Sequence, residues 1–344
     1  MERQNIFEAS VHYFLEPIGH LLDDESVTEI MVNRADDVYV ERGGKLVHTD
    51  VQFASNDALL SAIHNIAQWV GREISEEHPV LDARLPDGSR VHAVIPPSAR
   101  TGIYLTIRKF NRWYSSDDLI ASGSLPATVR DRVVGFMAEK KNGMISGGTG
   151  SGKTTLLKAF LDHIPLHERL LIIEQPAELQ LLHPHAVRWE AVDAIPGQVA
   201  ITPSELLAAA LRHRPDRIIM GEVRNECGYD LLQAMNTGHG GTLSTIHAKS
   251  AVDALNRLSN LALSARPNLN HAFVRAETAE AIDFVLHCER DTAGHRRVRE
   301  LLTVTGYSHA EQSFQTDALY RAPATAGPRL AMATPAQFDS VQGA

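Results

Sequence analysis

The sequence predicts an α/β protein with two domains: a small N-terminal α+β domain and a larger C-terminal domain built on a parallel sheet. In the first third of the chain, short segments of alternating polar and apolar residues are separated by turn residues, as in an antiparallel sheet. From about residue 126, apolar strands alternate with amphipathic helices, and a glycine-rich loop joins one strand to one helix. We therefore expect a ligand site at the carboxyl ends of the parallel strands.

The composition is that of an ordinary globular protein. Of the 344 residues, 44% are hydrophobic and 22% charged, and no apolar segment approaches the ~18 residues of a membrane span. The N-terminus lacks the apolar core of a signal peptide, so we expect a soluble, cytosolic protein. The net charge of -9 gives no general attraction for nucleic acid, although a local basic face stays open. Two cysteines, Cys227 and Cys288, are too few for a disulfide framework and are expected to be buried thiols.

The N-terminal domain is expected to cover residues 1–110. Gly43 and Gly44 separate two strands and form a hairpin turn. Asn56 is a good N-cap residue for a helix whose apolar positions follow helical spacing. The predicted strands are residues 27–33, 37–42, 45–47, 80–85, 90–95 and 103–108.

Residues 111–125 lose periodicity and are expected to form an interdomain linker, followed by the C-terminal domain at 126–306. The predicted strands of that domain are residues 142–146, 170–174, 217–221 and 241–246, with a final hairpin of 282–288 and 296–304. The predicted helices are residues 127–140, 153–163, 203–213, 226–236, 250–263 and 271–280. Residues 307–344 are rich in Ala, Pro, Thr and Gln, and we expect a largely disordered tail.

The glycine-rich loop fits the phosphate-loop pattern of a glycine, four free positions and Gly-Lys-Ser/Thr. Its residues are Gly147, Gly148, Thr149, Gly150, Ser151, Gly152, Lys153 and Thr154. Glycines allow the tight turn that points successive N–H groups at anionic oxygens. Lys153 would reach the β- and γ-phosphates of ATP, and the Thr154 hydroxyl would bind Mg²⁺.

Two further apolar strands end in a carboxylate. Glu222 follows the strand at 217–221, and Glu174 ends the strand at 170–174. Such an acid holds Mg²⁺ or orients the attacking water beside the γ-phosphate, although an acid that is merely solvated at a sheet edge remains the alternative. Because parallel strands present their carboxyl ends at one edge, we expect both acids beside the loop.

His239 and His247 flank another glycine-led strand. One interpretation places an imidazole where it contacts the γ-phosphate or responds to its loss, and the other is an ordinary satisfied histidine. The sequence leaves both open.

The order and spacing of these motifs resemble the traffic ATPases of type II and type IV secretion systems, and the conjugative-transfer branch matches best. The segments that carry the resemblance are residues 29–33, 105–110, 145–155, 178–179, 211–224 and 232–248. The resemblance implies a homo-hexameric ring of RecA-like P-loop NTPase domains at the cytoplasmic face of the inner membrane. Each N-terminal domain would cover the nucleotide and help to form the ring. The implied partners are inner-membrane and coupling components of a secretion or conjugation channel.

The family motifs transfer to residues 147–154 as Walker A, 217–222 as Walker B and 238–247 as the histidine box. Thr155 follows the loop and is grouped with the nucleotide-binding residues. Glu174 and Glu178 fall in the acidic box, where this chain departs from the usual Glu-Asp because Gln175 replaces the aspartate. Glutamine carries no charge, so either Glu174 and Glu222 suffice or hydrolysis is slow.

Arginine placement bears on control, since an arginine finger contributes ~10³–10⁵ in rate. In the family, arginines of the N-terminal domain and linker contact phosphate, and those that match its strands here are Arg84, Arg90 and Arg108. An ordinary surface arginine is the alternative for each. Arg224 is expected to form an ion pair.

A further basic cluster, Arg290, Arg296, Arg297 and Arg299, surrounds the C-terminal hairpin. We interpret it as a solvated turn rather than a membrane or partner surface.

The resulting hypothesis is a Mg²⁺-dependent ATP hydrolase that powers conjugative transfer, type IV secretion or pilus assembly through interdomain motion. One alternative is a nucleotide-gated scaffold with weak hydrolysis, which Gln175 would explain. Another is a RecA-type DNA motor, which the acidic balance disfavours. No sequence-specific nucleic-acid binding is expected, and any membrane association would be peripheral.

Overall fold

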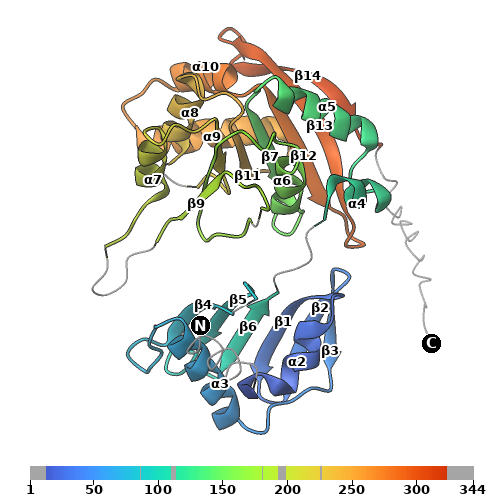
Figure 1. Cartoon of the computed structure of the whole chain (residues 1–344), viewed down its shortest axis with the longest axis vertical. Coiled ribbons are helices and arrows are strands. Elements are labelled where there is room, and N and C mark those ends of the chain that lie inside the picture. Colours follow the sequence, from blue (N-terminus) through green and yellow to red (C-terminus); the bar gives the residue numbers. More distant parts are fainter. Residues whose placement is uncertain are drawn as a thin grey trace, which may run out of the picture.

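The computed structural model describes residues 13–85, 87–109, 114–179, 181–192, 199–224 and 227–323. It contains two sheets, one in each of two domains that follow one another along the chain (Figure 1). The predicted α/β fold with a smaller N-terminal domain is therefore confirmed. No helix within these ranges is long and apolar enough to cross a membrane.

In its described residues, the N-terminal domain is a six-stranded antiparallel sheet in the order β3-β2-β1-β6-β5-β4, with two helices packed against it. Its strands are β1 (Val27–Arg34), β2 (Asp37–Arg42), β3 (Lys45–Thr49), β4 (Val80–Arg84), β5 (Arg90–Val94) and β6 (Tyr104–Arg108). Helices α2 (Glu16–Asp23) and α3 (Asn56–Trp69) bury side chains such as Ile18 and Ile63 in one core with the sheet. Ser55, rather than the predicted Asn56, caps α3, because its hydroxyl accepts a hydrogen bond from Ala58 N.

The C-terminal domain is built on an eight-stranded sheet in the order β14-β13-β12-β7-β11-β10-β8-β9. The strands from β12 to β9 run parallel, and β13 and β14 add antiparallel at one edge. Their bounds are β7 (Gly143–Gly147), β8 (Leu170–Glu174), β9 (Ala186–Glu190), β10 (Arg217–Met220), β11 (Leu243–His247), β12 (Phe284–Arg290), β13 (Arg296–Ser308) and β14 (Ser313–Arg321).

Helices cover both faces of this sheet (Figure 1). Along β8, Leu171 and Ile173 join the core beneath one set of helices, and Leu170 and Ile172 join the core beneath the other. Burial on both faces explains why these strands are continuously apolar. The helices are α5 (Ala127–Ala138), α6 (Lys153–Leu161), α7 (Pro203–Ala210), α8 (Cys227–Asn236), α9 (Ala251–Ala265) and α10 (His271–Ala281).

Three features differ from the sequence prediction. The expected linker at 111–125 contains a helix, α4 (Ser116–Ala121), which packs on α6. The first residues of the linker, 111–113, lie outside the described ranges. Strand β9 was not predicted. The expectation of disorder from residue 307 is wrong as far as residue 321, because β13 continues to Ser308 and β14 pairs along it. Residues 324–344 lie outside the description.

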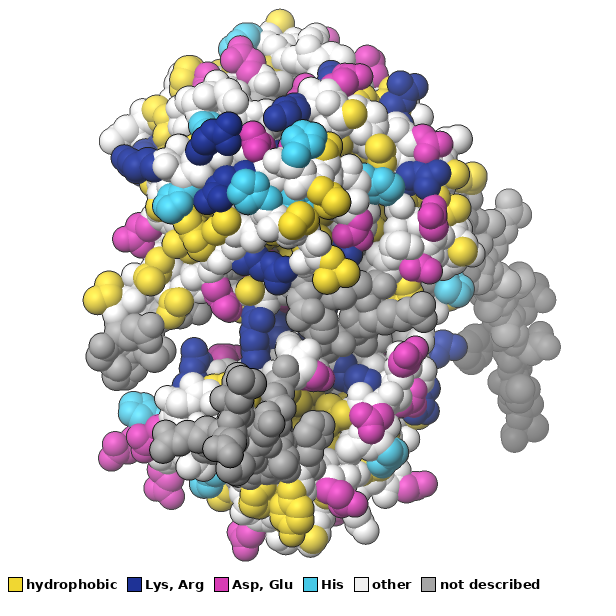
Figure 2. All heavy atoms as spheres, in the orientation of Figure 1, with side chains coloured by type: hydrophobic (Ala, Val, Ile, Leu, Met, Phe, Trp, Pro, Cys, Tyr) yellow, Lys and Arg dark blue, Asp and Glu magenta, His cyan; other side chains and the backbone are white. Residues whose placement is uncertain are grey.

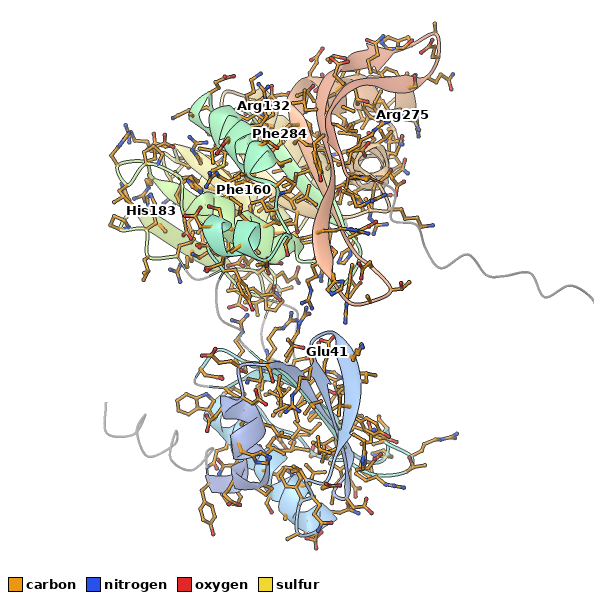
Figure 3. All side chains as sticks on the ribbon, turned by 90° about the vertical axis from the view of Figure 1, so that its right-hand side faces the viewer. Glu41, Arg132, Phe160, His183, Arg275 and Phe284 are labelled. Atoms are coloured by element: carbon orange, nitrogen blue, oxygen red, sulfur yellow. The ribbon has the colours of Figure 1, made fainter. Side chains whose placement is uncertain are left out.

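Close packing of β12 on β7 sets the position of the glycine-rich loop. A Cβ at Gly143, the first residue of β7, would lie 2.1 Å from the ring of Phe284. That ring stacks on Phe136 of α5 at a centroid distance of 5.1 Å, and Figure 3 shows it inside the larger domain. Only glycine therefore fits where β7 begins, and β12 is held directly beside the strand that leads into the loop.

Candidate active site

The phosphate loop connects β7 to α6 and has the backbone that its glycines permit. Gly150 has φ +68° and Gly152 has φ +94°, a left-handed conformation that residues with a Cβ rarely adopt. Gly147 is required for another reason, since a Cβ there would lie 2.4 Å from the carbonyl oxygen of Cys288. Gly148 and Thr149 at the tip are exposed, and Thr154 and Thr155 lie half-buried in the first turn of α6. The loop thus presents its backbone at a helix N-terminus, where anions bind.

Lys153 turns back into the loop. Its Nζ donates to Gly148 O at 2.9 Å and lies 3.3 Å from His247 Nδ1. The side chain is buried, and burial lowers the pKa of Lys153, with the positive charges of Arg224 and Arg108 acting in the same direction. His247 lies close to this lysine because β11 pairs with β7, which places His247 opposite Gly147 at the start of the loop.

His247 links the lysine to the acid after β10. Its Nε2 lies 3.0 Å from Glu222 Oε1. Burial, together with the charge of Lys153, lowers the pKa of His247, which favours the neutral imidazole. An ammonium only donates, so Nδ1 must accept from Lys153, and the ring proton of the neutral imidazole then lies on Nε2, the nitrogen close to Glu222. The second oxygen of Glu222 accepts from Arg224 Nη2 at 2.5 Å, which is the ion pair predicted for Arg224.

Glu174 lies at the end of β8, one strand from the end of β10. Its side chain is 3% exposed, and Oε1 accepts from the backbone N–H groups of Glu178 and Leu179 at 2.7 and 2.8 Å. Oε2 is buried and has no hydrogen-bond partner among the described residues. Burial raises the pKa of Glu174 to about 7, against the effect of the two backbone donors. This acid therefore changes its protonation state near neutral pH.

That shift predicts a pH-dependent stability. Between pH 5 and 7.5 the unfolded chain has already lost this proton, whereas the folded protein still holds it and loses it only as the pH approaches 7. Raising the pH across this interval should therefore reduce the free energy of unfolding of the wild type by about 2 kcal/mol relative to a Glu174→Gln variant. Urea unfolding of both proteins at pH 5 and 7.5 measures the difference. Parallel curves for the two proteins would contradict the prediction.

The three candidate arginines of the N-terminal domain occupy different positions. Arg90 Nη1 pairs with Glu178 Oε1 of the larger domain at 2.6 Å, and Arg84 Nη2 pairs with Glu190 Oε1 at 3.3 Å. Arg108 Nε instead lies 3.6 Å from Glu29 Oε1 within its own sheet. Figure 2 shows Lys and Arg side chains along the boundary of the two domains. Two of the three arginines therefore reach across to acids near Glu174: Glu178, four residues after it, and Glu190, opposite it at the end of β9.

The structure does not bring His239 to this site. His247 is the last residue of β11 and lies opposite Gly147, whereas His239 precedes the first residue, Leu243, which lies opposite Gly143. His239 thus lies before the amino end of β11, away from the carboxyl ends that carry the phosphate loop. There, a Cβ at the neighbouring Gly240 would lie 2.8 Å from Lys140 O. A catalytic role for His239 beside His247 is not supported by this geometry, because the length of β11 separates the two imidazoles.

The basic hairpin is not simply a solvated turn. Arg290 Nη2 pairs with Glu41 Oε1 of the N-terminal domain at 2.6 Å, and Arg296 Nε donates to Gly150 O of the phosphate loop at 2.8 Å. Arg297 and Arg299 pair with Glu289. Sequence reasoning missed Arg290 and Arg296 as site residues, and no local pattern distinguishes them from other arginines. Both cysteines are buried free thiols, as expected.

The described residues include no cluster of three or more His, Cys, Asp or Glu side chains that could hold a metal ion alone. Mg²⁺ at nucleotide sites needs fewer, since phosphates and waters complete its octahedron. Thr154, Glu222 and the unpartnered oxygen of Glu174 fit that requirement.

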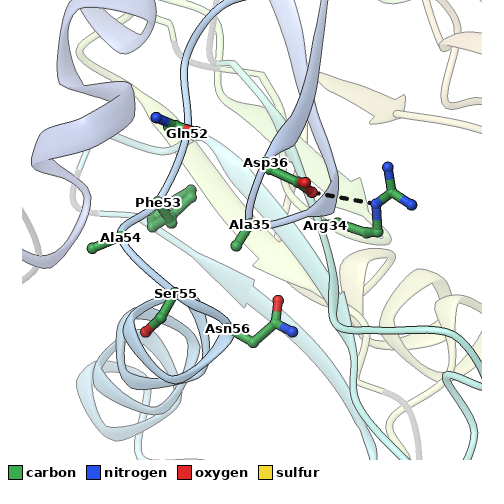
Figure 4. A pocket seen from close by; sticks show the side chains of 8 residues that line it. All are labelled: Arg34, Ala35, Asp36, Gln52, Phe53, Ala54, Ser55 and Asn56. Carbon is green, nitrogen blue, oxygen red and sulfur yellow. Dashed lines mark ion pairs between the residues drawn. The ribbon is translucent and has the colours of Figure 1, made fainter.

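A separate pocket of about 480 Å³ opens on the N-terminal domain, between the turn after β1 and the start of α3 (Figure 4). Arg34 and Asp36 line it and pair at 3.3 Å. Arg34 ends β1, whereas Glu29, the partner of Arg108, lies near its start. The pocket is therefore at the opposite end of β1 from Glu29 and Arg108.

Comparison with known proteins decides the family. A sequence profile described as "Type II/IV secretion system protein" matches residues 14–319. The chain belongs to this family. These secretion ATPases are ATP hydrolases, and the resemblance seen in the motifs is confirmed.

Relatives within the type II/IV secretion family cover most of the chain. "Conjugal transfer protein TrbB" of Rhizobium radiobacter is 34% identical over 300 residues, which is 86% of this chain and 88% of that protein. "Type IV secretion system protein VirB11" of Bartonella henselae is 31% identical over 315 residues, or 80% and 88% of the two chains. The Legionella pneumophila ATPase DotB shares the fold, with a TM-score of 0.61 at 22% identity over 85% of this chain and 80% of that one.

Proposed function

We propose that this member of the secretion ATPase family powers conjugative transfer or type IV secretion as a hexameric, Mg²⁺-dependent ATPase. The observation that carries the proposal is the contact series Lys153, His247, Glu222, in which a hydrogen bond from Lys153 to His247 and a 3.0 Å contact from His247 to Glu222 link the phosphate loop to the acid of a neighbouring strand. A structural loop has no need of a buried lysine that is connected to an acid in this way. The names of the relatives support the conjugative branch.

Each residue of the series has a proposed role. Lys153 stabilises charge that builds on the β- and γ-phosphates, and the loop N–H groups hold the phosphate oxygens. Glu222 orients the attacking water, and His247 couples the state of Lys153 to that acid. Thr154 with Glu222 and Glu174 would hold Mg²⁺, which neutralises phosphate charge when bound. Thr155 follows Thr154 in the first turn of α6 and is grouped with the nucleotide-binding residues.

The N-terminal domain, which we propose spans residues 1–110, supplies arginines to the same site. Arg90 and Arg84 are held by Glu178 and Glu190 in this structure. We propose that they exchange these carboxylates for phosphate when the domain closes over ATP, and that Arg108 joins them. Loss of phosphate would reverse the exchange, so hydrolysis would move one domain against the other.

Further elements of the proposal concern assembly. Six copies would form a ring at the cytoplasmic face of the inner membrane, in peripheral contact with the inner-membrane and coupling components of the channel. In this arrangement an arginine could act on a neighbouring subunit and make turnover depend on ring assembly.

Steady-state phosphate release by the purified chain tests the proposal. We expect release that requires Mg²⁺ and exceeds that of a Glu222→Gln variant. Turnover equal to that variant would instead favour a nucleotide-gated scaffold, the alternative that Gln175 supports by replacing a charged residue of the acidic box. Stimulation by DNA that falls steeply with salt would favour a DNA motor.

A further inference from the structure

The turn between β12 and β13 touches both the phosphate loop and the N-terminal domain. On the loop side, Arg296 Nε donates to Gly150 O at 2.8 Å, and its Cδ would lie 3.6 Å from a Cβ at Gly152. Arg290 also lies over the loop, with Nη1 3.4 Å from the Cβ position of Gly150. Two arginines of this turn therefore lie against Gly150 and Gly152 of the phosphate loop.

The contact with Gly150 O fixes the orientation of one peptide group. The carbonyl of Gly150 and the N–H of Ser151 belong to the same planar trans peptide, so they point in opposite directions. A donor that holds the oxygen outward therefore directs the N–H of Ser151 inward. Ser151 N indeed faces Gly148 O at 3.4 Å, the same oxygen that accepts from Lys153 Nζ. That N–H is one of the groups that a phosphate loop offers to its ligand.

On the other side, the turn meets the hairpin between β2 and β3. Arg290 Nη2 donates to Glu41 Oε1 and to Gly44 O. A Cβ at Gly294 would lie only 3.2 Å from Gly43 O, so the two turns are in close contact. Figure 3 shows Glu41 at the edge of the N-terminal domain that faces the larger one. The side chain of Glu41 is only 14% exposed and also accepts from Thr28 Oγ1 at 2.6 Å, so it is fixed in place.

The turn is also attached firmly to the loop through the sheet. Cys288, two residues before Arg290, lies opposite Gly147 in the pairing of β12 with β7. Its thiol is buried and lies 3.4 Å from Ser151 Oγ. A displacement of the turn by the N-terminal domain would therefore reach residues 147–151 through two routes, the strand pair and Arg296.

We propose that Arg296 is a positioning residue for the phosphate loop, and that the Arg290–Glu41 pair makes its position depend on the N-terminal domain. The inference rests on the proposed ATPase function. In this proposal, the hairpin of β12 and β13 makes the conformation of the phosphate loop depend on where the N-terminal domain lies. This role is separate from that of any arginine that contacts phosphate.

The first test separates affinity from chemistry. Because loop geometry affects the bound substrate and the transition state alike, Arg296→Ala should raise the KM for ATP about tenfold and leave kcat within about threefold. Arg296→Lys, which keeps a donor, should recover part of the loss. Arg297→Ala is the matched control on the same hairpin, where the side chain pairs with Glu289, and should change KM by less than about twofold. An unchanged KM in Arg296→Ala would overturn the proposal.

The second test needs no turnover. In the nucleotide-free protein, amide hydrogen exchange at residues 148–152 should be faster in Arg296→Ala, and faster to a smaller degree in Arg290→Ala and in Glu41→Gln. The double variant Arg290→Ala/Glu41→Gln should equal Arg290→Ala, since the two residues act as one pair. Additive effects would overturn the link to the N-terminal domain. If the variants showed this exchange pattern but the wild type released no phosphate, the ATPase function would fail and the positioning role would stand.

Discussion

Replacing Glu222 by glutamine is expected to lower kcat for ATP hydrolysis about 10³-fold while the protein still binds ATP. The carboxylate lies just after the end of β10, where Oε1 is 3.0 Å from His247 Nε2 and Oε2 accepts from Arg224. Glutamine keeps the size of the side chain and one acceptor oxygen, but it cannot take a proton from water. The loss should therefore fall on kcat rather than on nucleotide affinity. Phosphate release and equilibrium binding of ATP measure the two quantities.

The matched control is Glu277→Gln on α10, where the side chain contacts Asn236 far from the loop along the chain. It should leave kcat within about twofold. Glu222→Gln with kcat within tenfold of the wild type would contradict the assignment and direct attention to Glu174.

Replacing Arg217 by alanine is expected to reduce the free energy of unfolding by about 3–5 kcal/mol. Arg217 begins β10 and is 1% exposed; its Nε donates to Glu168 Oε2 at 2.5 Å and its Nη2 to Met137 O at 2.8 Å. Without the guanidinium, the carboxylate of Glu168, itself 7% exposed, would be left buried without a counter-charge. Urea unfolding of the two proteins measures the change.

Two further variants identify the cause of that loss. Arg321→Ala removes an exposed arginine that pairs with Glu300 at 2.9 Å, and it should reduce the free energy of unfolding by less than about 1 kcal/mol. The double change Arg217→Met/Glu168→Leu removes both buried charges and should recover most of the lost stability. A double variant no more stable than Arg217→Ala would show that packing volume, rather than the unpaired carboxylate, is responsible.

Sequence reasoning succeeded where the information is local. The patterns of the phosphate loop, of the acids at strand ends and of the turn at Gly43 depend only on neighbouring residues. The structure places Lys153, Glu174 and Glu222 at the carboxyl ends of the parallel strands. Helix α4 was missed although its signal is local, since Ser115 and Asp118 form a capping box. Strand β14 gave little signal because most of its residues are exposed at a sheet edge.

The contacts around the loop could not be predicted in this way. Arg290 and Glu41 are 249 positions apart, and Arg296 and Gly150 are 146 apart. Only the packing of two domains and the pairing of β12 with β7 bring them together. The prediction that His239 lies at the site with His247 fails for a local reason. The five-residue strand β11 is roughly 13–16 Å long, and His239 lies before its first residue whereas His247 is its last.

The internal contacts of Lys153 stabilise the phosphate loop when no nucleotide is bound. A buried ammonium without acceptors would be unfavourable in the nucleotide-free protein, and the loop would then tend to rearrange. Because Gly148 O and His247 Nδ1 accept from it, the charge keeps its partners after phosphate departs. The empty loop can thus keep the conformation that receives phosphate without leaving a buried charge unpaired.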